Sequence, residues 1–95
     1  MIKSPNTILR LCKSRDVKIV VEDIGDNHLG YVYIENKVIH IDKHQQIKQR
    51  VSTLIHECLH ILNPKAHEYT IAGIERDTLE ILSKKQYNEL SKLVV

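Results

Sequence analysis

Two histidines and a glutamate in one short stretch have the residue types and spacing of a metal site. His56 and His60 are four residues apart in the apolar, helix-prone run 51–62. Each residue of an α-helix turns by about 100°, so the two imidazoles share one face of the helix, one turn apart. Such a pair can bind one tetrahedral Zn²⁺ through nitrogen. Glu57 then projects beside the metal, where it can accept a proton from metal-bound water.

The stretch reads His-Glu-Cys-Leu-His, which is the HExxH pattern that zinc metallopeptidases carry on a helix. A pattern with three fixed positions in five also occurs by chance, so the residues around it must show whether this match is meaningful. Within and around the motif lie apolar residues, as expected of a buried helix: Leu54, Ile55, Leu59, Ile61 and Leu62. We therefore predict that His56 and His60 bind the metal and that Glu57 is the general base.

A third protein ligand is needed, because a catalytic zinc usually has three protein ligands and a water. The pair Asn63-Pro64 should end the motif helix, and so short a connection turns the next helix back antiparallel to it. A residue in the first turns of that helix would then meet the metal. We favour Glu68, and His67 and Glu75 remain open as alternatives.

The rest of the chain predicts an α+β domain with a small sheet packed on the motif helix. The β-branched run 17–22 is typical of a strand, and 31–42 is typical of a β-hairpin. Alternation places Ile39 and Ile41 on one face of that hairpin. Further helices are expected over 5–14, over 65–84 (with Asn63 as its N-cap and Pro64 in its first turn) and over 86–95.

Composition narrows the class of protein. With 95 residues the chain is expected to form one domain, 1–95, whose small core a bound metal would stabilise. A net charge of +2 argues against a dedicated nucleic-acid-binding protein. Cys12 and Cys58 suggest no disulfide framework and are expected as core residues. With no signal peptide or membrane span visible, we expect a cytoplasmic protein.

The chain also resembles a known family. The run Thr53–His60 is similar to the active-site helix of zincin-like metallopeptidases of the gluzincin type, in which a glutamate on a following helix is the third zinc ligand. The run 64–82 resembles small metallopeptidases common in phage and bacterial genomes, and Glu68 and Asp77 match their acidic positions. The resemblance covers roughly residues 17–84.

The resemblance implies zinc-dependent hydrolysis of peptide bonds, with the peptide or protein substrate laid along an edge strand of the sheet as an extra strand. An alternative function is a catalytically silent or latent zincin-fold module that binds a host protein or nucleic acid. A C-terminal segment, 83–95, could cover the cleft in a latent form. By residue type alone, the side chains that could stabilise an oxyanion are His28, Tyr31, His40 and Tyr69.

Overall fold

The structure, a computed structural model of the chain, describes residues 4–25 and 27–95. Residues 1–3 and 26 of the predicted domain lie outside this described part. In chain order the elements are α1 (Pro5–Cys12), β1 (Lys18–Glu22), β2 (Gly30–Tyr33), β3 (Val38–Asp42), α2 (Ile47–Leu62), α3 (Glu68–Ile81) and α4 (Lys84–Lys92). The predicted α+β class is confirmed.

The three strands form one mixed sheet in the order β1-β3-β2. β2 pairs antiparallel with β3, which confirms the predicted hairpin, and β1 pairs parallel with β3. The predicted alternation is also confirmed, because Ile39 and Ile41 are fully buried while the residues on either side of them are partly exposed. β2 is an edge strand, paired on one side only within the described residues.

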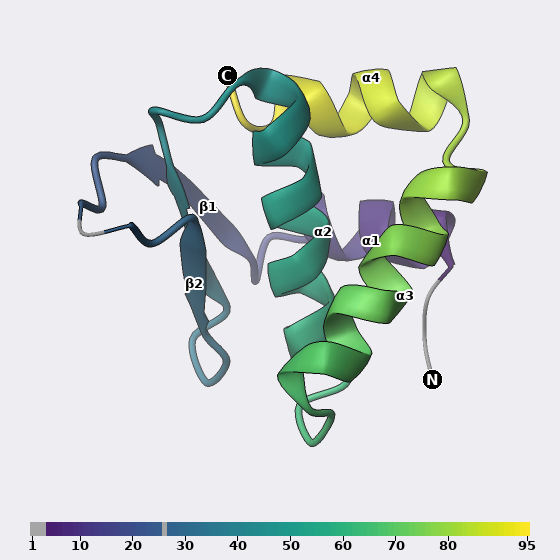
Figure 1. The fold of residues 1–95 in the computed structure, drawn as a ribbon, viewed down its shortest axis with the longest axis horizontal. Coiled ribbons are helices and arrows are strands. Elements are labelled where there is room, and N and C mark those ends of the chain that lie inside the picture. Colours follow the sequence, from purple (N-terminus) through teal and green to yellow (C-terminus); the bar gives the residue numbers. More distant parts are fainter. Residues whose placement is uncertain (1–3, 26) are drawn as a thin grey trace.

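The motif helix α2 lies at the centre of the molecule, between the sheet on one side and α3 on the other (Figure 1). α3 returns antiparallel to α2, as the short connection predicts. α4 crosses the end of the molecule where α2 begins, and it contacts both α1 and α2. Arg50 of α2 connects this helix to the C-terminal segment, because its Nη1 donates to the carbonyl oxygen of Val94 at 2.9 Å.

The core is aliphatic and surrounds α2. The fully buried residues of α2 are Val51, Leu54, Ile55, Cys58 and Leu59. They pack in one cluster with Ile8 and Leu9 of α1, with the two buried isoleucines of β3, with Ile71 of α3 and with Leu90 and Val94 near the C-terminus. Burial of this apolar surface stabilises the helix that carries the HExxH motif.

Several predicted helix boundaries were wrong, since α1 ends at Cys12 and α4 ends at Lys92, and the contacts explain the boundaries at the start of α3 and between α3 and α4. Asn63 does not cap the start of the next helix, because its backbone N–H (2.8 Å) and its side-chain amide (3.2 Å) both donate to the carbonyl oxygen of Leu59. Asn63 therefore caps the end of α2, and Pro64 lies in the turn that follows. α3 begins later than predicted, at Glu68, with His67 as its N-cap residue.

The other boundary falls at Ser83, where the predicted helix 65–84 gives way to α4. The Ser83 hydroxyl accepts from the N–H of Gln86 at 3.0 Å, and the Gln86 side chain accepts from the N–H of Ser83 at 2.8 Å. This reciprocal pair is a capping box, and it starts α4 at Lys84 rather than at residue 86. The Ser-x-x-Gln spacing is visible in the sequence and could have located this boundary.

Candidate metal centre

The two motif histidines lie side by side on the face of α2 that is turned toward α3. Their ring centroids are 5.0 Å apart, and each side chain is about one-fifth exposed, at 19% for His56 and 18% for His60. This is the juxtaposition that a four-residue spacing on a helix predicts. Both rings are thus largely buried, and part of each side chain remains exposed to solvent.

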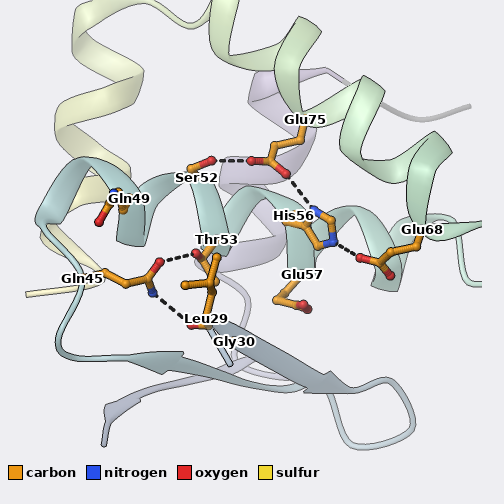
Figure 2. A pocket seen from close by; sticks show the side chains of 10 residues that line it. All are labelled: Leu29, Gly30, Gln45, Gln49, Ser52, Thr53, His56, Glu57, Glu68 and Glu75. Carbon is orange, nitrogen blue, oxygen red and sulfur yellow. Dashed lines mark hydrogen bonds and ion pairs between the residues drawn. The ribbon is translucent and has the colours of Figure 1, made fainter. Parts of the chain in front are cut away.

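Glu68, the first residue of α3, contacts both histidines. Its Oε2 lies 2.9 Å from Nε2 of His60, and its Oε1 is in closer contact with Nε2 of His56. The carboxylate reaches this position because the connection after α2 is short and α3 returns along the same face (Figure 2). Two imidazole nitrogens from one helix and a carboxylate from the next thus converge on one point.

The two alternatives for the third ligand lie elsewhere. His67 is exposed, and its ring stacks on the ring of Tyr69 with centroids 6.0 Å apart. Glu75 lies two turns along α3 and holds the other nitrogen of His56, with Oε1 2.7 Å from Nδ1. Its second oxygen accepts a hydrogen bond from the hydroxyl of Ser52. Glu75 therefore orients the His56 ring from the side opposite to Glu68.

The charges of this cluster are coupled. The hydrogen bond with Glu75 raises the pKa of His56 to about 9, against the opposing effect of burial and with a further contribution from Glu68. Burial opposes ionisation of both glutamates, but their hydrogen bonds with His56 prevail and lower the pKa of Glu68 and of Glu75. Both carboxylates are thus anionic at neutral pH, as a cation-binding site requires.

Glu57 has a different environment. Its side chain is only 6% exposed and makes no hydrogen bond with any described residue. Burial, together with the nearby charges of Glu68 and Glu75, raises its pKa to about 7, although His56 acts in the opposite direction. A carboxylate that titrates near neutral pH is suited to take up and release a proton.

A cleft of about 380 Å³ opens beside these residues. Figure 2 shows its lining, which combines α2 and α3 with the start of the edge strand: Leu29, Gly30, Gln45, Gln49, Ser52, Thr53, His56, Glu57, Glu68 and Glu75. None of these residues belongs to the segment 83–95, which forms α4 and the C-terminus and packs on α1 and α2. In this structure the C-terminal segment does not cover the cleft.

The edge strand is held close to the motif helix by two features. Gly30 lies so near to α2 that a Cβ atom at this position would come within 2.5 Å of the Thr53 side chain. Gln45 is 8% exposed, donates to the carbonyl oxygen of Leu29 at 2.9 Å and accepts from the Thr53 hydroxyl at 2.9 Å. The amide of Gln45 thus joins the start of β2 to α2 one turn before His56.

Several residues singled out by type alone do not reach the cleft. Tyr31 and His40 stack on each other with ring centroids 4.4 Å apart, and Glu22 holds Nδ1 of His40 at 2.9 Å. Tyr69 is 79% exposed. Asp77, which matches an acidic position in the family resemblance, is exposed and 3.8 Å from Arg76. His28 is exposed as well, and none of the four suggested oxyanion-stabilising residues is among the residues that line the cleft.

Sequence reasoning also missed residues that the structure brings to the site. Ser52 lies four residues before His56, so helical spacing could have placed it on the same face. Gln45 gave no signal, because it precedes the helix and acts through tertiary contacts. Asp23, Asp42 and His44 form a second group whose ligand atoms lie within 4.8 Å of one another, and none of them lines the cleft.

The donor set of the main cluster suits a metal ion. His56, Glu57 and His60 offer ligand atoms that all lie within 4.8 Å of one another, and Glu68 touches both histidines. Neutral imidazole with carboxylate is a ligand combination found in zinc sites. A carboxylate on the far nitrogen of a ligating histidine, as Glu75 is placed here, is a common feature of such sites.

Comparison with solved structures finds a metallopeptidase with a similar fold. The chain is similar to the crystal structure of the metallopeptidase zymogen of Pyrococcus abyssi abylysin, with a TM-score of 0.54 and 16% sequence identity. The likeness covers 90% of this chain and 87% of that one. At this identity the likeness shows a shared fold.

No family model and no curated protein sequence matches the chain. Among the described residues, no helix is both long and apolar enough to span a membrane. The chain thus shares its fold with a metallopeptidase zymogen, and its histidine–glutamate cluster is a candidate metal site.

Proposed function

We propose that the chain is a zinc-dependent peptidase in which His56, His60 and Glu68 bind the metal. The observation that carries this proposal is the position of the Glu68 carboxylate, which reaches the Nε2 atoms of both motif histidines from a separate helix. A chance HExxH sequence on a helix surface would have no reason to meet a carboxylate there. The shared fold with a metallopeptidase zymogen supports the same proposal.

Zinc, when bound, would supply a Lewis acid that polarises the substrate carbonyl and makes water more acidic. The remaining roles fall to residues of the chain. Glu57 takes the proton of the attacking water and passes it to the nitrogen of the leaving amine. Glu75 keeps the His56 ring in the orientation that presents Nε2 outward, since it engages Nδ1.

The substrate is proposed to be a peptide in extended conformation. Leu29 and Gly30 place the start of the edge strand β2 along the cleft that also holds Glu57. The backbone of β2 pairs with β3 on one side, so a peptide can add as a further strand on the other. Such backbone pairing would orient a peptide bond of the substrate relative to Glu57 and would depend little on the substrate's side chains.

The test compares zinc content and cleavage in the full chain and two variants. Glu68→Gln should lose stoichiometric zinc, measured by metal analysis after gel filtration, because an amide is a much weaker ligand than a carboxylate. Glu80→Gln, on the exposed surface of the same helix, is the matched control and should bind zinc as the wild type does. Unchanged zinc affinity in Glu68→Gln would overturn the proposed ligand set.

Glu57→Gln tests the enzymatic part. It should keep zinc but lose cleavage of a mixed peptide library by at least about 100-fold, which is the typical contribution of a general base. Equal cleavage by wild type and variant would exclude Glu57 as the base. A zinc-loaded wild type that cleaves no peptide or unfolded protein would instead favour the alternative, a zincin-fold binding module.

A further inference from the structure

The chain has two cysteines, and the structure places them against each other in the core. Cys12 lies in the last turn of α1, and Cys58 lies in α2 within the HExxH motif. Their Sγ atoms are 3.0 Å apart, although 46 positions separate the two residues in sequence. Cys12 is 5% exposed and Cys58 is fully buried. Each thiol therefore has the other as its hydrogen-bond partner.

We propose that Cys12 and Cys58 are an oxidation site at which a reversible disulfide forms. The sulfur atoms lie closer than two sulfurs in ordinary van der Waals contact, so a modest approach of α1 toward α2 brings them to bonding distance of about 2.05 Å. No charged residue stands between them, and the fold has already brought together the two ends of the loop that the bond would close. Simple core packing explains the burial of two small side chains but does not require that the thiols face each other.

The reaction balances with a small-molecule disulfide as the oxidant. The two protein thiols are oxidised to one S–S bond, and the oxidant is reduced to two thiols that receive the two protons and two electrons. Access requires α1 to detach briefly, because both sulfurs are covered in the folded chain. α1 buries Ile8 and Leu9 in the core, so its detachment is a partial unfolding of the domain, and refolding from denaturant gives the oxidant direct access to the thiols.

The bond would tie α1 to the side of the motif helix that faces away from the metal centre. Cys58 is two residues from His56 and two from His60, which places it about 200° round the helix from either imidazole. The disulfide would thus cross-link α2 to α1 on the core side and would not involve the imidazole nitrogens of His56 and His60. For so small a core, closing a loop of this length should raise the melting temperature by roughly 10 °C or more.

The experiment equilibrates the full chain in a buffer of reduced and oxidised glutathione, both from the native state and by refolding from denaturant. Refolding exposes the thiols, so burial cannot prevent the reaction. After acid quenching and alkylation, most molecules should be lighter by two hydrogen atoms and carry no alkyl group. Trypsin should then release residues 11–13 joined to residues 51–65.

Cys12→Ala is the matched control, and it should give no internal cross-link under the same conditions. In the wild type the higher melting temperature should disappear when the disulfide is reduced. Two fully alkylated thiols after both routes, or a disulfide that joins two molecules instead of one, would overturn the proposal. These readouts involve neither zinc nor cleavage, so their outcome is independent of the proposed function.

Discussion

The two faces of α2 have opposite properties. The face toward α3 and the cleft carries four polar residues, Ser52, His56, Glu57 and His60. Carboxylates of α3 contact Ser52 and the two histidines, and Glu57 lines the cleft. The face toward the core is aliphatic and packs with α1, the sheet and α4. One helix thus carries the polar residues of the candidate site on one face and the apolar residues that stabilise the domain on the other.

The difference teaches where the stability of this small domain comes from. The core face gains free energy from apolar burial, whereas the cleft face includes Glu57, whose ionisation is opposed by its surroundings. Changes on the core face should therefore reduce stability and leave the metal chemistry intact. Changes on the cleft face should alter metal binding, and some should increase the stability of the protein when metal is removed.

Leu59→Ala on the core face should have the largest effect on folding. Leu59 is fully buried and is one of the two variable positions within the HExxH motif, and removal of its side chain should lower the free energy of unfolding by about 2–5 kcal/mol. Urea denaturation measures this change, with exposed Lys48→Ala on the same helix as the control, expected to stay within about 0.5 kcal/mol. Zinc stoichiometry of the folded fraction should not change. A loss of zinc from folded Leu59→Ala would show that the two faces are not separable.

Glu57→Gln should stabilise the metal-stripped protein above neutral pH. In the folded chain the pKa of Glu57 is raised from 4.5 to about 7, so the folded state holds this proton more tightly than the unfolded state. Stability is therefore lost as the pH rises from 4.5 through 7, by about 3 kcal/mol at ~1.4 kcal/mol for each pH unit. Glutamine does not ionise, so the variant should lack this loss. Urea denaturation in the presence of a chelator, at pH 5 and at pH 8, measures the free energy of unfolding of both proteins. An equal change between the two pH values in wild type and variant would contradict the prediction.

Glu75→Gln should have the smallest of these effects. Glu75 holds Nδ1 of His56 rather than Nε2, the nitrogen proposed to bind the metal, so its loss should weaken zinc binding about 10- to 100-fold without abolishing it. Competition with a chromophoric chelator measures the affinity, with Glu80→Gln as the control. If Glu75→Gln loses zinc completely while Glu68→Gln retains it, the roles of the two glutamates on α3 are reversed.

The sequence by itself determined the shared face of His56 and His60, the hairpin, the alternation of Ile39 and Ile41, and the return of a helix after Asn63-Pro64. These follow from local periodicity and from residues that break helices, which are properties of neighbouring positions. The same reasoning put Glu68 and Glu75 on one helix as alternatives for one role. It misplaced the start of that helix, because Asn63 can cap either of two helices and only its contact with Leu59 decides between them.

Only the tertiary structure decided which nitrogen of His56 each glutamate meets, because that depends on how far α3 is displaced along α2. It also decided that Gln45 joins the edge strand to Thr53 and that the suggested tyrosines lie outside the cleft. Cys12 and Cys58 show the same limit. The local sequence around each cysteine predicts only that it is a core residue. Their contact across 46 positions depends on the packing of α1 against α2. Contacts between distant segments are set by packing of the whole chain, which no local pattern contains.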